Sequence, residues 1–244
     1  MELQTLIKPA GFMKIMEIQQ LRNKLKSLEN KERAEKSKSY LKSPYEFYGI
    51  SVPELRKIAK ECKLKFYDTL NLFDELWNSG NHEEMSLALY ILGKHIKEQP
   101  LEIWEFLFER LEKAKTWDHI DEISCHILGE ILANNISLTS EIKKMSESRN
   151  PWIRRTSIVS TYNLIKKCKI ELTFLLAEKL IYDEDIYVQK GTGWMLREAG
   201  KKNRLALREF IMMHLNMKPS AFSYATEKML ELRQIKKEKL KNIS

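Results

Sequence analysis

The stretch Trp152-Ile153-Arg154-Arg155 is followed, 35 residues later, by a similar stretch, Tyr187-Val188-Gln189-Lys190. Leu92-Gly93 and Leu128-Gly129 recur 36 residues apart, and Phe222-Ser223 begins 35 residues after Tyr187. Helix pairs that repeat every ~35–40 residues are typical of α-solenoids of the HEAT or armadillo kind. We therefore predict an all-α, right-handed solenoid of HEAT-like repeats, with equivalent positions aligned along a concave face. An irregular helical domain with coincidental spacing is the alternative.

Helical periodicity runs through the chain, and strand-like alternation is absent. Gly and Pro number only 8 and 6, which leaves little turn material for an all-β fold. Ser51 to Glu54 has capping-box spacing, and Asn150-Pro151 offers an N-cap followed by proline. We expect a single HEAT-like repeat domain over 1–244, with about six helical pairs and frayed ends at 1–12 and 238–244. The expected helices are 14–27, 30–42, 52–64, 67–78, 82–97, 100–113, 117–132, 138–148, 151–166, 170–180, 185–200, 202–216 and 220–238.

The net charge of +8 is unevenly distributed. Residues 1–80 hold 15 basic and 11 acidic residues (+4), residues 81–150 hold 8 and 13 (−5), and residues 151–244 hold 19 and 10 (+9). A basic end beside an acidic middle favours a polyanion-binding surface, which gives the predicted concave face its basic character. Solvated helix faces with a lysine-rich tail are the alternative.

The cysteines and the missing motifs exclude several classes of protein. Cys62, Cys125 and Cys168 are widely spaced and form no metal motif, as in reduced cytosolic proteins. The first residues lack the apolar core of about 7–15 residues that a signal peptide needs. No apolar run approaches the roughly 18 residues of a membrane span. Nucleotide-binding glycine loops, HExxH and GxSxG are absent as well, so we expect a cytoplasmic protein without metal or cofactor.

Trp117 and Asp121 lie four residues apart near the start of an expected helix and therefore share one face. An aromatic surface beside a carboxylate suits a cationic partner, and glycosidic bond cleavage builds such a cation on the sugar ring. The repeat spacing adds Arg155, 34 residues after Asp121, and Trp194 on the equivalent helix of the next repeat. We expect these four side chains to converge on the concave face.

Structural explanations exist for each of these residues taken singly. Tryptophan is often a packing residue, and we expect Trp152 to pack between repeats. Asp118 suits the first turn of a helix, where a carboxylate favours the dipole. Arg154 and Arg155 are also compatible with a solvated pair. His119 should face away from Trp117 and Asp121, so we do not expect it to act as an acid or base.

The segment from Ser39 to Ile50 ends a helix and carries three tyrosines. It can lie against a sugar–phosphate backbone. A hydrophobic plug between the first repeats explains it equally well.

Longer motifs in the chain resemble the AlkD family of DNA glycosylases, HEAT-like-repeat enzymes that excise alkylated purines. The resemblance covers nearly the whole chain and includes Phe47-Tyr48-Gly49-Ile50 followed by Pro53-Glu54-Leu55-Arg56. Its most specific part is the run Gln-Lys-x-x-Gly-Trp-x-Leu-Arg-Glu. The other matching stretches are Trp117-Asp118-His119-Ile120-Asp121, Pro151-Trp152-Ile153-Arg154-Arg155 and Val188-Gln189-Lys190-Gly191-Thr192-Gly193-Trp194-Met195-Leu196-Arg197-Glu198.

The resemblance implies a role for each matching residue. Asp121 corresponds to the catalytic carboxylate, and Trp117 and Trp194 correspond to indoles that lie along the backbone of the damaged nucleotide. Arg155 corresponds to an arginine beside the lesion phosphate, although the adjacent Arg154 leaves this register open. The further DNA contacts implied by the resemblance are Tyr40, Lys190 and Arg197.

The implied activity is hydrolysis of the N-glycosidic bond of cationic alkylpurines, of the 3-methyladenine and 7-methylguanine type, in duplex DNA. The resemblance implies that the base stays stacked and that no metal takes part. We expect a monomer whose partner is double-stranded DNA with alkylated bases, working in the cytoplasm at the nucleoid and not at a membrane. The alternative is a non-catalytic HEAT-repeat module that binds nucleic acid or protein through the same face.

Overall fold

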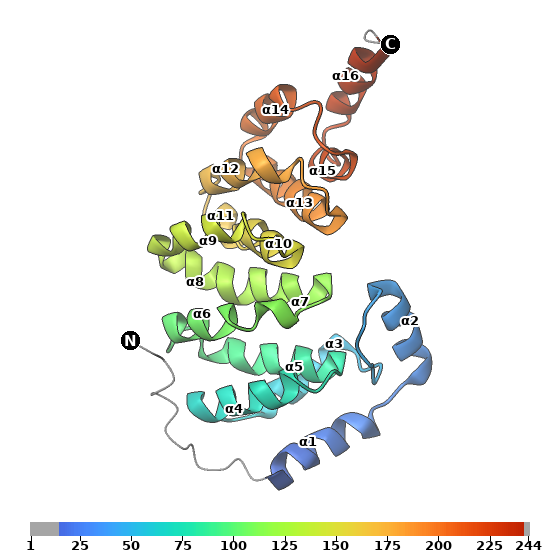
Figure 1. Cartoon of the computed structure of the whole chain (residues 1–244), viewed down its shortest axis with the longest axis vertical. Helices are drawn as coiled ribbons and strands as arrows, with labels where there is room; N and C mark the ends of the chain where they lie inside the picture. The colour runs from blue at the N-terminus through green and yellow to red at the C-terminus, as the bar shows by residue number, and fades with distance from the viewer. Residues whose placement is uncertain (1–14, 242–244) are drawn as a thin grey trace. The chain divides into compact units, whose positions relative to one another are not determined.

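The computed structural model describes the backbone of residues 15–241 and the side chains of residues 18–235. Within these residues all regular structure is helical, and one isolated bridge joins Glu46 to Asn81. The predicted all-α class is therefore confirmed. The chain divides into two compact units between Leu107 and Phe108, and each is described by itself (Figure 1).

The described residues of the first unit form six α-helices. α3 and α4 both pack against α5, which is buried along almost its whole length. The predicted capping box begins α3, where the backbone N–H of Ser51 donates to the Glu54 carboxylate at 3.0 Å. The helices are α1 (Ile15–Ser27), α2 (Lys31–Leu41), α3 (Val52–Glu61), α4 (Phe66–Trp77), α5 (His82–Leu92), followed by a 3-10 turn (Gly93–His95), and α6 (Pro100–Phe108), which ends at the division.

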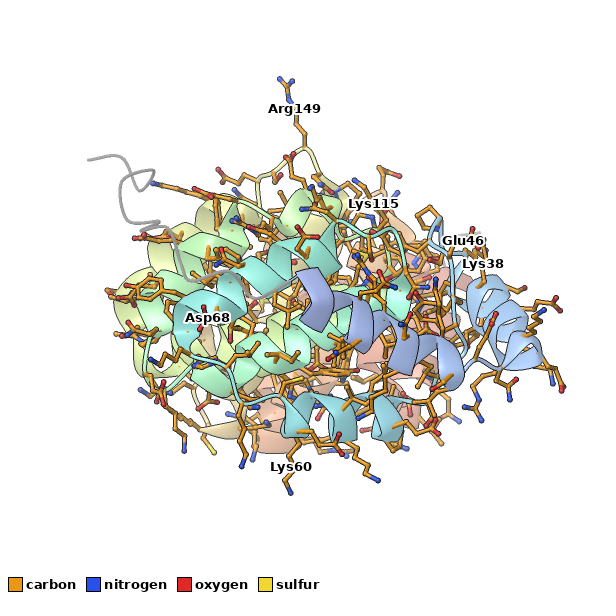
Figure 2. The ribbon with its side chains drawn as sticks, turned by 90° about the horizontal axis from the view of Figure 1, so that it is seen from below. Lys38, Glu46, Lys60, Asp68, Lys115 and Arg149 are labelled. Atoms are coloured by element: carbon orange, nitrogen blue, oxygen red, sulfur yellow. The ribbon has the colours of Figure 1, made fainter. Side chains whose placement is uncertain are left out.

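The loop between α2 and α3 is held by a buried glutamate. The Glu83 carboxylate accepts backbone N–H groups of Tyr48, Gly49 and Ile50, at 3.0, 2.7 and 3.2 Å. Gly49 has a φ of +78°, and a Cβ there would lie 2.1 Å from the Asn30 carbonyl oxygen. These contacts fix the backbone of this tyrosine-rich segment. Figure 2 shows the ion pair between Lys38 and Glu46 (2.7 Å), which joins α2 to this loop.

The second unit is a series of helices that pack in chain order. α10 packs against α7 and α13, and α13 packs against α15. The regular elements are a 3-10 turn (Leu111–Lys113), α7 (Trp117–Glu122), a π-helical segment η4 (Ile123–Leu128), α8 (Gly129–Asn134), a 3-10 turn (Ile136–Leu138), α9 (Thr139–Met145), α10 (Pro151–Val159), α11 (Tyr162–Lys166), α12 (Glu171–Leu180), α13 (Ile186–Lys202), α14 (Arg204–Met213), α15 (Pro219–Ala225) and α16 (Leu230–Lys241).

Five predicted helices differ from the observed ones. Residues 82–97 form α5 and a 3-10 turn, and residues 100–113 form α6 and, after a break, another 3-10 turn. Residues 117–132 contain the π-helical segment η4, and 151–166 is interrupted after Val159. At that interruption the Thr161 hydroxyl donates to the Ile158 carbonyl at 2.7 Å, so a side chain takes up a backbone acceptor. Residues 220–238 form α15 and α16 with a break between them. Of the ends expected to fray, 1–12 and 242–244 lie outside the described residues, whereas 238–241 belong to α16.

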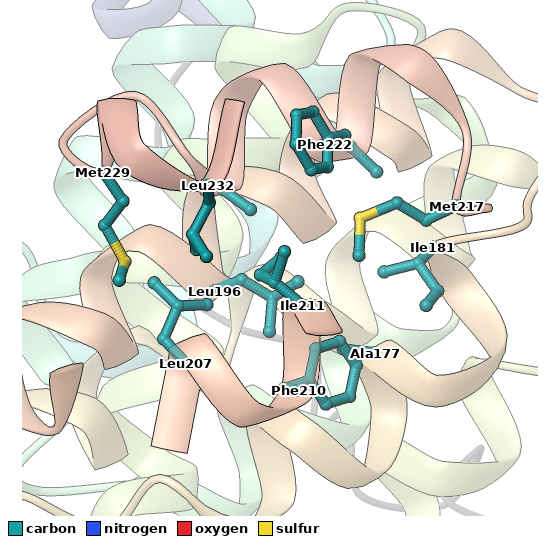
Figure 3. Close-up of a cluster of buried hydrophobic side chains, with 12 residues drawn as sticks. Ala177, Ile181, Leu196, Leu207, Phe210, Ile211, Met217, Phe222, Met229 and Leu232 are labelled. Atoms are coloured by element: carbon teal, nitrogen blue, oxygen red, sulfur yellow. The ribbon is translucent and has the colours of Figure 1, made fainter. Parts of the chain in front are cut away.

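Contacts between repeat-related positions join neighbouring layers of the second unit. The rings of Trp152 and Tyr187 lie 5.0 Å apart, which confirms the expectation that Trp152 packs between repeats. Ion pairs of similar spacing link Glu147 to Lys179 and Glu184 to Lys218, at 2.8 and 2.7 Å. The core between α12 and α16 is an apolar cluster that includes Leu196, Phe210, Ile211 and Phe222 (Figure 3). These regular contacts are what a repeat array requires.

Candidate active site

Asp121 and Arg155 form a bidentate ion pair in the second unit. Arg155 Nε donates to Asp121 Oδ1 at 2.9 Å, and Nη2 donates to Oδ2 at 2.8 Å. The arginine side chain is 6% exposed and the aspartate side chain 18% exposed. The guanidinium is therefore fixed inside the protein, whereas part of the carboxylate still faces solvent. This geometry orients the carboxylate and leaves each oxygen a lone pair.

Two effects act on the pKa of Asp121 in opposite directions. Burial penalises the charged form and raises the pKa above its ordinary value, and the nearby Asp118 adds to this increase. The charge and hydrogen bonds of Arg155 favour the ionised form and lower the pKa. Burial is the larger effect, so the net direction is upward. Arg155 thus offsets part of the increase that burial causes in the pKa of Asp121.

Arg155 is held in place by α13 as well as by Asp121. Its Nη1 group donates to the Tyr187 carbonyl oxygen. A Cβ on Gly191 would lie only 2.9 Å from Nη1 and 3.3 Å from a methyl group of Val159. Gly191 therefore provides the space in which the guanidinium lies. This role was not predicted from the sequence, although the glycine within the helical motif was the available signal.

The π-helical segment η4 begins two residues after Asp121. Asn163 Nδ2 donates to the Cys125 carbonyl oxygen at 2.7 Å, and the Ser124 hydroxyl donates to the Ile120 carbonyl at 2.6 Å. A Cβ on Gly129 would lie 2.8 Å from the Ser160 carbonyl oxygen, so this glycine permits the close approach of the next layer. π-Helical turns often occur at functional sites. Asn163 was not recognised from the sequence.

The two tryptophans lie on different helices of the second unit. Trp117 is half-buried one turn before Asp121 on α7, as the spacing predicts. Trp194 is half-buried on α13, and its ring lies 6.0 Å from that of Tyr162. Lys166 is exposed and stands over the Tyr162 ring at 4.5 Å. Tyr162 and Lys166 therefore accompany Trp194, an association that was not predicted from the sequence.

Arg154 is engaged by other groups of the protein. It forms a bidentate pair with Asp183, at 2.6 and 2.8 Å, and its Nη1 also donates to the carbonyls of Ser148 and Arg149. Hydrogen bonding to Asp183 raises the pKa of Arg154 further. Four of its five N–H groups are thus occupied at the junction of α10 and α13. Of the two arginines, only Arg155 contacts Asp121.

The remaining predicted DNA contacts lie in different environments. Lys190 is half-buried on α13, with its ammonium 5.9 Å from the centre of the Tyr187 ring. Arg197 pairs with Glu227 further along α13. Tyr40 lies in the first unit and is 73% exposed.

His119 is buried, and its Nδ1 lies 3.2 Å from the Thr116 hydroxyl. Taken by itself, neither described unit brings three His, Cys, Asp or Glu side chains together as ligands for a metal ion.

Comparison with known families identifies the chain. The model of the DNA alkylation repair enzyme family matches residues 21–229. The chain belongs to the DNA alkylation repair enzyme family. The match includes every residue of the candidate active site, and membership gives this enzyme a role in DNA alkylation repair.

A solved structure has the same fold as this DNA alkylation repair enzyme. It is described as a predicted DNA alkylation repair enzyme from Enterococcus faecalis, and it superposes with a TM-score of 0.73 at 21% sequence identity. The match covers 82% of this chain and 96% of that chain. A search of curated proteins finds no match. Among the described residues, no helix is both long enough and apolar enough to cross a membrane.

Proposed function

We propose that this family member is a monofunctional DNA glycosylase that hydrolyses the N-glycosidic bond of cationic alkylpurines in duplex DNA. The observation that carries the proposal is the partly exposed carboxylate of Asp121. It is oriented by the buried Arg155 and lies one helical turn after Trp117. Substrates of the 3-methyladenine and 7-methylguanine type suit this site. We further propose a single functional domain over the whole chain, which acts as a monomer without a metal ion.

The cationic base simplifies the chemistry that the enzyme has to perform. When the glycosidic bond breaks, both electrons go to the purine, whose positive charge is cancelled, so no acid is needed for the leaving group. Positive charge then develops on the sugar, where Asp121 stabilises it. Water adds to the anomeric carbon and gives its proton to the carboxylate. Arg155 keeps the carboxylate oriented, and its positive charge favours the ionised form until the proton of the water arrives.

The aromatic and basic residues supply contacts to the substrate. The indole faces of Trp117 and Trp194 stabilise the sugar cation and lie along the backbone of the damaged nucleotide. Lys190 and Arg197 contact phosphates, and Tyr40 contacts the backbone from the first unit. Arg155, rather than Arg154, is the arginine of the site, because Arg154 is occupied by Asp183. Contacts to the backbone alone allow the base to remain stacked.

A non-catalytic DNA-binding module is the second candidate. One observation favours it: both Asp121 oxygens already accept hydrogen bonds from Arg155, so part of the carboxylate charge is neutralised. The two candidates differ in what Asp121 does, because a binding module does not require its negative charge.

The test is release of 7-methylguanine from methylated duplex DNA by the wild type, Asp121→Asn and Asp118→Asn. We expect the Asp121 variant to lose about 100-fold or more in single-turnover rate, because a preorganised charge is removed. Asp118→Asn is the matched control on the same helix and should retain most activity. Absence of release by the wild type contradicts the enzymatic proposal, and equal rates for the wild type and Asp121→Asn contradict the role of Asp121.

A further inference from the structure

A groove of about 570 Å³ opens in the second unit where α9, α11 and α12 meet (Figure 1). Its walls are mainly aliphatic, and its most deeply buried lining residue is Leu164 of α11. Ile136 and Leu175 also line it, although their side chains are 58% and 46% exposed. None of the lining residues belongs to the candidate active site. Exposed apolar surface around a concave site commonly marks a place where another molecule binds.

Two local features form the edges of the groove. At one edge, the 3-10 turn before α9 presents Ile136. At the other, Cys168 has a φ of +61°, and the N–H groups of Cys168 and Lys169 donate to the carbonyls of Ile165 and Leu164 at 2.9 and 3.0 Å. These bonds form a Schellman motif, in which the residue after the left-handed position packs against the end of the helix. The motif therefore places Lys169 beside Leu164 at the groove.

One turn further along the same two helices, an ion pair replaces the groove. Lys179 of α12 pairs with Glu147, which follows α9, at 2.8 Å. Leu175 and Lys143 lie four residues earlier than these two residues, on the same helix faces, and both line the groove. A leucine and a lysine cannot form the charged pair that joins the layers elsewhere. The described residues of the chain therefore leave this aliphatic surface uncovered.

The charged side chains at the groove carry a positive excess. Lys143 and Lys169 are exposed, and neither ammonium group forms a hydrogen bond or an ion pair with a described residue. Glu171 is the one carboxylate among the described residues that line the groove, and it forms no ion pair with them. Two positive charges and one negative charge leave an excess of one. A partner that carries acidic residues beside apolar ones therefore complements the groove.

The backbone of the partner is best satisfied in a helix. The regular structure of the described residues is helical, so the groove offers no strand edge to which an extended peptide could add. A helix satisfies its own backbone hydrogen bonds and can present apolar side chains at i, i+4 and i+7 to an aliphatic groove. Carboxylates beside those positions would face Lys143 and Lys169.

We propose that this groove binds an acidic amphipathic helix of a partner protein. The aliphatic side chains of that helix pack against Leu164, Leu172 and Leu175, and its carboxylates pair with Lys143 and Lys169. The groove is a second functional surface that shares no residue with the candidate active site. The proposal does not depend on glycosidic bond cleavage.

The test uses a fluorescent synthetic helical peptide with leucines at i, i+4 and i+7 and glutamates beside them, and fluorescence anisotropy measures its binding to the full chain. We expect saturable binding by the wild type and about tenfold weaker binding by Leu175→Gln, because an amide replaces an apolar contact. Lys143→Gln/Lys169→Gln should bind about fivefold more weakly and lose most of the salt dependence of the wild type. A peptide with lysines in place of the glutamates should bind about tenfold more weakly than the acidic peptide.

Leu205→Gln and Lys144→Gln are the matched controls. Leu205 is 61% exposed on α14, Lys144 is exposed next to Lys143, and neither lines the groove. Both variants should bind the acidic peptide like the wild type. Thermal unfolding and binding of undamaged duplex DNA check that Leu175→Gln is folded, and both should match the wild type.

Several results overturn the proposal. They are no binding of the acidic peptide by the wild type, equal affinity for the lysine peptide, and an equal loss of affinity in the control variants. Equal binding of an acidic peptide with a central proline contradicts a helical partner. A wild-type dimer in analytical ultracentrifugation that Leu175→Gln converts to a monomer assigns the groove to a second copy of this chain instead.

Discussion

The Asp121 carboxylate can stabilise a sugar cation only in its ionised form. Two effects determine the pH range in which it is ionised. Burial raises its pKa, and Arg155 partly offsets that increase. The spacing to Trp117 singled out the aspartate, and the repeat length placed Arg155 on the same face, but their bidentate ion pair was not predicted. Gly191 could not be predicted as the residue that makes room for the guanidinium, because that role depends on the distance between α10 and α13.

The first prediction concerns the pH dependence of excision. An acid whose folded pKa is raised loses its charge already at a higher pH, so the wild-type rate should fall on acidification at a pH above the ordinary range of an aspartate. Arg155→Gln removes the group that lowers the pKa, so the acidic limb should move to still higher pH and the maximal rate should drop. Single-turnover release of 7-methylguanine between about pH 4 and pH 8 measures both effects.

Arg154→Gln is the matched control for that profile. It removes an adjacent arginine that also forms a bidentate pair with an aspartate, Asp183, but not with Asp121. We expect this variant to unfold at a lower temperature and to keep the acidic limb of the wild type. An identical shift in both variants would mean that general destabilisation, and not the charge beside Asp121, determines the profile.

At the scale of helices, the periodicity placed most elements within a few residues of their observed bounds. The predicted and observed ranges are 170–180 and Glu171–Leu180 for α12, and 52–64 and Val52–Glu61 for α3. The π-helical segment after Asp121 was not predicted. Its hydrogen bond comes from Asn163, 38 residues away from Cys125 along the chain, and local pattern carries no information about such a bond.

The second prediction tests whether this segment positions Asp121. Asn163→Asp has nearly the same shape but replaces the amide donor with an acceptor, so the Cys125 carbonyl loses its bond. We expect unfolding to become easier by about 1–3 kcal/mol and the rate at saturating DNA to fall, while affinity for undamaged DNA is retained. Thermal unfolding, single-turnover rates and DNA titration separate these quantities.

Asn134→Asp provides the comparison. Asn134 also donates its amide to a helix carbonyl, that of Glu130 at 3.0 Å, but the bond is exposed. Loss of this hydrogen bond should change neither the unfolding temperature nor the single-turnover rate appreciably. If Asn163→Asp lowers stability but leaves the rate at saturating DNA unchanged, the π-helical segment is structural and does not position the carboxylate.

At the scale of the whole molecule, the uneven charge distribution determines how the protein meets DNA. The carboxyl-terminal residues 151–244 carry +9 and residues 81–150 carry −5, although helices of both stretches contribute to the candidate active site. This asymmetry can be counted directly from the positions of the charged residues in the sequence. The sequence does not show that many of the cations form ion pairs, as Lys179 does with Glu147 and Lys218 with Glu184. Such pairs join neighbouring repeats, and their positions depend on how the helices pack.

The third prediction follows from this difference between engaged and available cations. Lys190 is half-buried on the Trp194 face of α13, whereas Lys144 is exposed on α9 in the acidic stretch. Each substitution by glutamine removes one charge, so a uniform electrostatic attraction predicts equal effects. We expect Lys190→Gln to weaken binding of undamaged duplex and to reduce the log–log salt slope by about one, and Lys144→Gln to change neither. Equal losses in the two variants would show that DNA responds to net charge and not to the face of α13.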